Sequence, residues 1–175
     1  MDYVSLYNLD EENVFQEINY DEFMKMFDTL QTGLVLLGGA WCKNARLIVP
    51  YLNRIAKENN ISKIYNFDLK YFNDFGVQGD LRTGTSLDHR LEYFNIAEKT
   101  GIDSKETVGN TMMPRIPSPT LIAIRNGSCA DYITFKYLKD EEEPKTDLSK
   151  EEQEDFTEKV KSLIKKVKTD DRFKL

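Results

Sequence analysis

The sequence contains two cysteines, Cys42 and Cys129, and the first stands where a reactive thiol is expected. Apolar residues recur at helical spacing from Cys42 to the polar Glu58, which predicts a helix of about four turns beginning at this cysteine. The first turn of a helix offers unpaired N–H groups and the positive end of the helix dipole, and both favour thiolate over thiol. We therefore expect Cys42 to be the more reactive of the two cysteines.

The residues around Cys42 allow two interpretations. Lys43 and Arg46 lie in the same predicted turn, where they would either add positive charge near the sulfur or project into solvent. A catalytic cysteine would use that charge, whereas a purely structural one would pack as a small apolar side chain under Trp41.

Other residues that can do chemistry give weaker signals. His89, the single histidine, is predicted to be a polar surface residue, because no neighbour in the sequence completes a Cys-His arrangement. The segment Met112-Met113-Pro114 is predicted either to line a groove beside Pro119 or to pack at the end of a loop. Residues 140–143 are predicted to form a solvated acidic loop. Two cysteines and one histidine cannot supply a four-ligand zinc site, so we expect no metal.

The composition narrows the class of protein. A chain of 175 residues, 40% hydrophobic and 31% charged, fits one compact domain over residues 1–175. A net charge of −6 argues against a general nucleic-acid binder. No run approaches the roughly 20 apolar residues of a membrane span, and residues 1–4 do not begin a basic and then apolar leader. We therefore expect no membrane partner. We also expect the protein to be cytoplasmic, because free thiols persist in the reducing cytoplasm.

The elements that must position Cys42 are a buried strand before it and a helix after it. Residues 33–39 are a continuous apolar run ended by glycines, typical of a central strand. Pro50 lies inside the helix that follows, where it should produce a kink. Residues 61–69 are the next strand, parallel to the first because a helix separates the two.

Flanking elements complete the pattern. After a polar lead, residues 14–18 are predicted to form a strand, and Asn19 with Glu22 opens a helix from residue 21 to about 30. Residues 120–124 and 132–135 flank Asn126-Gly127, a strong hairpin signal.

The last amphipathic helix follows a capping box, and the stretch before the hairpin is harder to interpret. Ser149 and Glu152 open the helix, which continues through Val167. Residues 75–80 and 82–85 have the composition of loops. Ser86 can cap a helix running to Thr100, and Gly101 ends it. Four positions are expected to face the core: Leu87, Leu91, Phe94 and either Ile96 or Ala97.

Two local motifs resemble those of the thioredoxin family. A tryptophan precedes the family's nucleophilic cysteine, and a helix-kinking proline follows it by eight residues; Trp41, Cys42 and Pro50 match. The family also has a cis-proline followed by threonine, an apolar run and an Asn-Gly turn, which residues 119–127 reproduce.

The resemblance covers about residues 13–69 and 117–168. It implies an α/β thioredoxin-like fold, with a central mixed sheet flanked by helices and an insertion at about residues 71–116 before the cis-proline strand. It also implies that Cys42 is catalytic and lies in a substrate groove. The groove residues implied are Trp41, Lys43, Asn44, Ser118 and Pro119, the cis-proline letting Ser118 offer backbone hydrogen bonds to an extended substrate.

Two departures from the family change the expected mechanism. Ala45 stands where the family carries its resolving cysteine, and Leu36 replaces a buried aspartate that helps to move that cysteine's proton. Cys129 is not a substitute, because the implied hairpin carries it to the opposite pole, beyond the roughly 7 Å between Cα atoms that a disulfide spans. Cys129 is therefore expected to be structural.

Two functions fit these residues. The first is a monothiol thiol–disulfide oxidoreductase, in which Cys42 forms a mixed disulfide with a protein disulfide or thiol substrate and an external thiol such as glutathione releases it. The second is a non-catalytic thioredoxin-fold module that binds a protein segment in the same groove. Oxidation could instead join two copies through Cys42, although we expect a monomer without a cofactor.

Overall fold

The computed structural model describes residues 1–72, 78–80, 87–108 and 112–168. Its main sheet has five strands in the order β1 (Phe15–Glu17), β3 (Ile64–Phe67), β2 (Gly33–Leu37), β6 (Thr120–Arg125) and β7 (Ser128–Thr134). Strands β1, β3 and β2 are parallel, β6 is antiparallel to β2, and β7 is antiparallel to β6. This order and these directions are those of the thioredoxin fold, as the sequence predicts.

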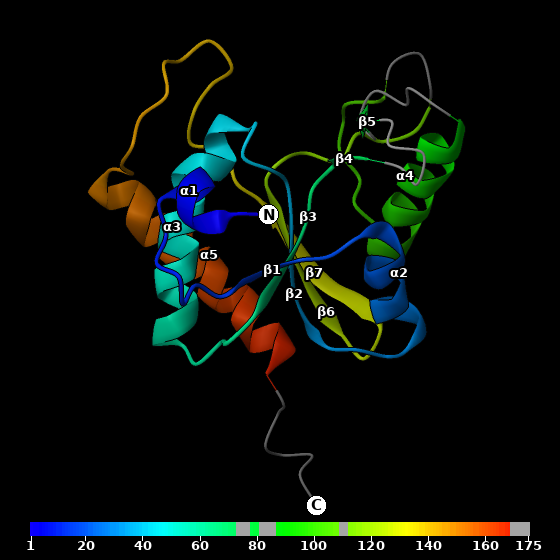
Figure 1. Ribbon diagram of the computed structural model, residues 1–175, viewed down its shortest axis with the longest axis horizontal. Coiled ribbons are helices and arrows are strands. Elements are labelled where there is room, and N and C mark those ends of the chain that lie inside the picture. Colours follow the sequence, from blue (N-terminus) through cyan, green and yellow to red (C-terminus); the bar gives the residue numbers. More distant parts are fainter. Residues whose placement is uncertain (73–77, 81–86, 109–111, 169–175) are drawn as a thin grey trace, which may run out of the picture.

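Helices cover both faces of the sheet (Figure 1). On one face lie α1 (Tyr3–Tyr7), α3 (Lys43–Glu58) and α5 (Lys150–Val167), and on the other lie α2 (Tyr20–Asp28) and α4 (Leu87–Thr100). The central strand β2 serves both cores, because successive side chains of a strand point to opposite faces. Leu36 packs in the core under α3, whereas Val35 and Leu37 pack in the core under α2 and α4.

Most local signals in the sequence produce the elements they predict. Asn19 and Ser149 each form a complete capping box at the start of α2 and α5. Pro50 lies within α3, and the 33–37 run is a buried strand. Asn126 and Gly127 turn the β6–β7 hairpin with φ angles of 49° and 75°, which glycine and asparagine tolerate best.

Helix α1 is an element that the sequence interpretation missed, since its residues were assigned to a polar lead. Asp2 caps the helix by accepting a hydrogen bond from the Ser5 N–H. Tyr3 and Tyr7, four residues apart, turn their rings inward and stack at 6.0 Å between centroids. An acidic cap followed by two aromatic residues at this spacing was the available signal.

The segment between β3 and β6 differs from its prediction. Strand β4 (Lys70–Phe72) pairs antiparallel with β5 (Gln78–Asp80), so residues 78–80 are not loop. The predicted cap Ser86 and the predicted loops at 75–77 and 82–85 lie outside the described residues. Gly101 ends α4 with φ of 67°, as predicted.

The buried face of α4 differs from the predicted one at Leu87, Leu91 and Phe94, and agrees with it at Ile96. Leu87, Leu91 and Phe94 are 71%, 56% and 47% exposed. The buried positions are Ile96, which the prediction offered as an alternative to Ala97, together with His89, Tyr93 and Thr100. Apolar residues lie on both faces of this helix, so their periodicity alone does not predict which face is buried. In the structure Tyr93 is on the buried face, and its hydroxyl accepts a hydrogen bond from the Ile116 N–H. The prediction that His89 lies on the surface was therefore wrong.

Candidate functional site

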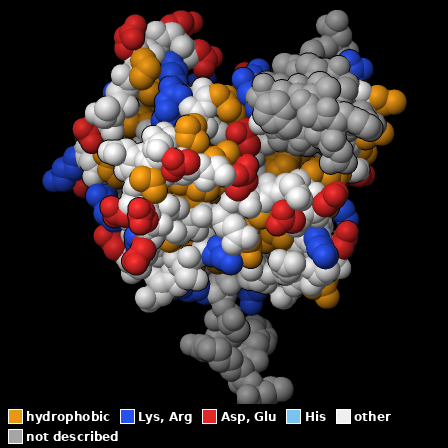
Figure 2. Space-filling model, viewed as in Figure 1, with side chains coloured by type: hydrophobic (Ala, Val, Ile, Leu, Met, Phe, Trp, Pro, Cys, Tyr) orange, Lys and Arg blue, Asp and Glu red, His pale blue; other side chains and the backbone are white. Residues whose placement is uncertain are grey.

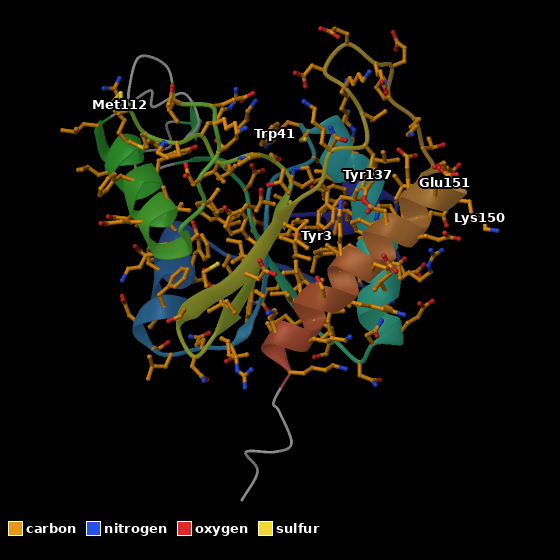
Figure 3. All side chains as sticks on the ribbon, turned by 180° about the vertical axis from the view of Figure 1, so that it is seen from behind. Tyr3, Trp41, Met112, Tyr137, Lys150 and Glu151 are labelled. Atoms are coloured by element: carbon orange, nitrogen blue, oxygen red, sulfur yellow. The ribbon has the colours of Figure 1, made fainter. Side chains whose placement is uncertain are left out.

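Cys42 is the N-cap residue of α3, immediately after the loop that leaves β2. Its thiol is half-buried and donates to the carbonyl oxygen of Ser118, with 3.5 Å between Sγ and that oxygen. The Ser118–Pro119 peptide bond is cis, as the resemblance implies. Figure 3 shows Trp41, the neighbour of Cys42, at the end of the sheet between the two helical layers. The structure thus brings Trp41, Cys42, Ser118 and Pro119 together.

Two glycines let the loop before Cys42 pass between its neighbours. A Cβ atom on Gly38 would lie 2.7 Å from the Ser118 Oγ, and the φ of +151° at Gly38 is one that other residues rarely adopt. A Cβ atom on Gly39 would lie 2.5 Å from both Asp68 Oδ2 and Trp41 Nε1. Glycine is therefore required at both positions for this arrangement.

Asp68 is a site residue that the sequence interpretation missed. Its Oδ1 accepts hydrogen bonds of 2.8 Å from the Trp41 indole N–H and of 2.8 Å from the Lys70 backbone N–H. The Lys70 ammonium lies 4.6 Å from the centroid of the Trp41 ring. Burial raises the pKa of the Asp68 carboxyl, and the hydrogen bond from Trp41 partly opposes that shift. A carboxylate directly after a buried parallel strand was the available signal.

Lys43 and Asn44 hold a neighbouring segment. The Lys43 ammonium donates to the backbone carbonyls of Lys139, Asp140 and Glu142. The Asn44 side chain is buried and makes three hydrogen bonds to the backbone of residues 137 and 138. Their predicted contacts with a substrate stay predictions, and the structure gives both residues a structural role.

The two positions that depart from the family are fully packed. Ala45 is 0% exposed and Leu36 is 1% exposed, and neither can carry a proton. Asn66, the register partner of Leu36 on β3, donates its side-chain amide to the carbonyls of Leu36 and Gly38 at 2.9 and 3.0 Å. Tyr3 in turn donates to the Asn66 Oδ1 at 3.0 Å.

Cys129 lies at the other end of the sheet, as predicted. It pairs with Ile124 across the hairpin, so it is about 16 Å along the strand from Pro119. Its thiol donates to the Asp131 carbonyl at 3.6 Å. Burial raises the pKa of the Cys129 thiol to about 11, with a further contribution from the charge of Asp131. Cys129 therefore contributes no second thiol to the site.

Two further surface features were expected from the sequence. Figure 2 shows acidic side chains gathered at the tip of the loop between β7 and α5, where residues 140–143 are exposed as predicted. Met112, which is 94% exposed, lines a groove of about 580 Å³ together with Met113 and Pro114. This groove lies against α4 and does not include Pro119. The other lining residues are Phe94, Ala97, Glu98, Gly101 and Ile102.

No protein-family model matches the chain, and no curated protein matches it. Similar solved structures exist. A thioredoxin from Malassezia sympodialis (Mala s 13) is 19% identical, with a TM-score of 0.41, over 72% of this chain and 83% of that chain. Thioredoxin O2 from Arabidopsis thaliana is 12% identical, with a TM-score of 0.46, over 92% of this chain and 100% of that chain.

Thioredoxin f2 from Chlamydomonas reinhardtii is also similar, with 16% identity and a TM-score of 0.40 over 69% of this chain and 82% of that chain. The assignment of the fold rests on the strand order and directions of this chain and not on these scores. None of the helices in the described ranges has the length and apolar character needed to cross a membrane.

Proposed function

We propose that this chain is a thioredoxin-like redox protein that captures a thiol partner at Cys42 and depends on an external thiol for its release. One observation carries the proposal. The half-buried Cys42 sulfur stands at the N-terminal end of α3 beside the Ser118 carbonyl, and no second thiol in the described residues is within reach.

The capture step needs only the Cys42 sulfur and a disulfide. The Cys42 thiolate attacks one sulfur of a substrate disulfide, forms a mixed disulfide with it and expels the other substrate sulfur as a thiolate. An external thiolate then attacks the substrate sulfur of the mixed disulfide. That second step restores the Cys42 thiolate and leaves a new disulfide between the substrate and the external thiol, so electrons and atoms balance.

The need for an external thiol follows from the packing around Cys42. The buried Ala45 has no sulfur to attack the mixed disulfide, and the buried Leu36 has no titratable group that could act as an acid or base. Cys129 is far away along the hairpin and its thiol stays protonated at neutral pH. Glutathione is our candidate for the external thiol.

The substrate proposed is an extended protein segment carrying a cysteine or disulfide. The edge formed by Ser118 and Pro119 beside Cys42 would hydrogen-bond such a segment through its backbone, and Trp41 would pack against it. We propose that the protein acts as a monomer in the cytoplasm, without a resident cofactor or metal.

The alternative function is a non-catalytic module that binds a protein segment at the same edge. The observation that favours it is the loss of both turnover residues, since Ala45 and Leu36 pack as ordinary core side chains. This alternative predicts binding without formation of a mixed disulfide.

The test is the reaction of the protein with iodoacetamide over a range of pH and with glutathione disulfide, each located by peptide mass mapping. Selective alkylation at Cys42 and a single glutathione adduct there are expected, and Cys129→Ser should behave like the natural protein. Cys42→Ser is the blank. A Cys42 that reacts no faster than a free cysteine and forms no adduct would exclude the oxidoreductase function.

A further inference from the structure

The groove against α4 is a feature that the proposed function does not use. It has a volume of about 580 Å³ and lies between the second half of α4 and the segment that leads to the cis-proline. A volume of about 300–1,000 Å³ is usual for a binding pocket. Among the described residues that line it, Glu98 alone is charged and the others are apolar or glycine. The groove therefore suits a large apolar group with a positive charge beside it.

Two large apolar side chains are exposed at this groove. Phe94 of α4 is 47% exposed and Met112 is 94% exposed, although both line a pocket whose other wall includes the buried Ile102. Exposed apolar side chains that gather around a pocket mark sites of interaction, whereas isolated ones do not. The unbranched side chain of methionine can also adapt its shape to a partner. The groove therefore has the character of a binding surface.

The groove lies close to the Cys42 site along the chain. Pro114 lines the groove, and Ser118, whose carbonyl oxygen accepts the hydrogen bond from Cys42, follows four residues later. Four residues span at most about 14 Å, even when they are fully extended. Figure 3 shows Met112 and Trp41 at the same end of the molecule. A protein segment bound at Cys42 can therefore reach the groove with a residue about four positions from its own cysteine.

Hydrogen bonds fix the segment between the groove and the Cys42 site. The Arg115 N–H donates to the Glu106 carbonyl at 2.8 Å, and the Ile116 N–H donates to the Tyr93 hydroxyl of α4. Pro117 has no N–H. The α4 wall of the groove is thus held against the segment that leads to the cis-proline. A partner that follows this segment finds no free backbone N–H along it, so recognition must come from side chains in the groove.

The charge at the groove favours a partner of opposite sign. Glu98 is exposed and has no ion-pair partner among the described residues. The adjacent Lys99 pairs with Asp28 at 3.9 Å, and Arg115 pairs with Glu106 at 3.6 Å. Because these nearby cations are already paired, the carboxylate complements a lysine or arginine brought by a partner.

We propose that this groove is a second binding site for the protein that Cys42 captures. It takes one large apolar side chain of that protein, next to a lysine or arginine that pairs with Glu98, about four residues from the captured cysteine. The inference rests on the proposed function, because the chemistry occurs at Cys42 and the groove acts on the rate of capture. A side chain buried in the groove holds the partner's disulfide near the Cys42 thiolate, which speeds the reaction at low partner concentration.

The test measures the rate at which Cys42 captures synthetic peptides. Each peptide consists of glycine and serine around one cysteine, which is joined in a disulfide to 2-nitro-5-thiobenzoate. The Cys42 thiolate attacks the peptide sulfur and forms a mixed disulfide with it, and 2-nitro-5-thiobenzoate leaves as a coloured thiolate. Cys42→Ser is the blank. The rate of colour release is therefore the rate of capture at Cys42.

The peptides differ only in what they offer to the groove. Two of them carry Phe-Lys, one about four residues before the cysteine and the other about four residues after it. One of these two should react about tenfold faster than the peptide without Phe-Lys, because its phenyl ring is buried in the groove. Phe-Glu at the same place should react about twofold to fivefold more slowly than Phe-Lys, because its charge repels Glu98.

Variants of exposed residues assign the effect to the groove. Phe94→Ser should bring the ratio of the rates with and without Phe-Lys close to one, whereas Leu91→Ser, on the same helix but outside the groove, should keep the ratio. Glu98→Lys should make Phe-Glu the faster peptide. If Phe94→Ser does not fold, Met112→Ser replaces it, since Met112 is 94% exposed and its loss should lower the same ratio.

The outcomes separate this inference from the proposed function. Equal rates for all peptides, equal acceleration by Phe-Lys on both sides of the cysteine, or an unchanged preference in Glu98→Lys would overturn the inference alone. An equal loss of the ratio in Phe94→Ser and Leu91→Ser would also overturn it. So would a dimer of the natural protein that Phe94→Ser separates in sedimentation, because a second copy would then fill the groove. Colour release no faster than from the Cys42→Ser blank would overturn both the inference and the proposed function.

Discussion

Replacing Gly39 by alanine should dismantle the contact between Trp41 and Asp68. The added Cβ would lie 2.5 Å from the Asp68 Oδ2 and 2.5 Å from the Trp41 Nε1, the two side chains joined by a 2.8 Å hydrogen bond. Relieving both contacts requires the indole and the carboxylate to move apart. The site would then lose the hydrogen bond between Trp41 and the Asp68 carboxylate, and the added methyl group would overpack the space between them.

The expected loss of stability combines these two effects. A hydrogen bond to a charged group contributes about 1.5–3 kcal/mol, and overpacking costs about 1–3 kcal/mol. Because relaxation relieves part of the second effect, we expect Gly39→Ala to lower the free energy of unfolding by about 2–4 kcal/mol. Gly33→Ala is the control, since its nearest atoms would lie 3.5 Å away, an ordinary contact. There, alanine should be neutral or stabilise the strand by about 0.5–1 kcal/mol.

The assay is urea unfolding followed by the fluorescence of Trp41, which is the single tryptophan of the chain. Gly39→Ala should also change the emission of the folded protein, because the indole loses its contact with Asp68. Adding Asp68→Ala to Gly39→Ala should cost less than the sum of the single changes, since the carboxylate that clashes is gone. An unfolding free energy within about 0.5 kcal/mol of the natural protein, with unchanged emission, would refute this account of the loop.

Three further predictions concern Asp68, Asn44 and Cys129. Burial raises the pKa of the Asp68 carboxyl above its ordinary 3.8, so its contribution to stability is complete below that pH and is lost as pH rises through the folded-state pKa. The urea midpoint of Asp68→Asn, relative to that of the natural protein, should therefore increase as the pH rises from 3.5 to 7. A difference between the two midpoints that does not change with pH would contradict this. Asn44→Ala should lower the free energy of unfolding by about 1–3 kcal/mol, because the backbone groups of residues 137 and 138 lose their hydrogen-bond partners. An unchanged urea midpoint would show that these hydrogen bonds do not contribute to stability. Cys129, with its pKa raised to about 11, should react slowly with iodoacetamide at pH 8 until urea unfolds the protein. Rapid labelling of Cys129 in the folded protein would contradict the conclusion that its thiol is buried.

The parts of the fold that the sequence predicts are those whose signals are local. The glycine-ended apolar run of β2, the capping boxes at Asn19 and Ser149, and the Asn126-Gly127 turn each depend on neighbouring residues only. The cysteine at the start of α3 belongs to the same class. These elements bring Cys42 and the Ser118–Pro119 bond together, so the centre of the site could be predicted.

The parts that the sequence did not predict depend on distant contacts. Asp68 bonds to an indole far from it in the sequence, and the Tyr3 hydroxyl of α1 bonds to Asn66 on β3, 63 positions away. The face that α4 buries could not be chosen by periodicity, since apolar residues such as Leu91 and Ile96 lie on both of its faces. Lys43 shows the converse case, where a plausible neighbour of the sulfur is occupied by another segment.

The dependence of Cys42 on an external thiol is tested most directly by following a glutathione adduct after its isolation. We predict that the adduct at Cys42 persists in buffer without thiol, and that added reduced glutathione releases it and restores the free cysteine. In Ala45→Cys the adduct should resolve without any added thiol, because the new sulfur can attack the mixed disulfide from within the chain. Loss of the adduct from the natural protein in the absence of thiol, or failure to form it at all, would contradict the account.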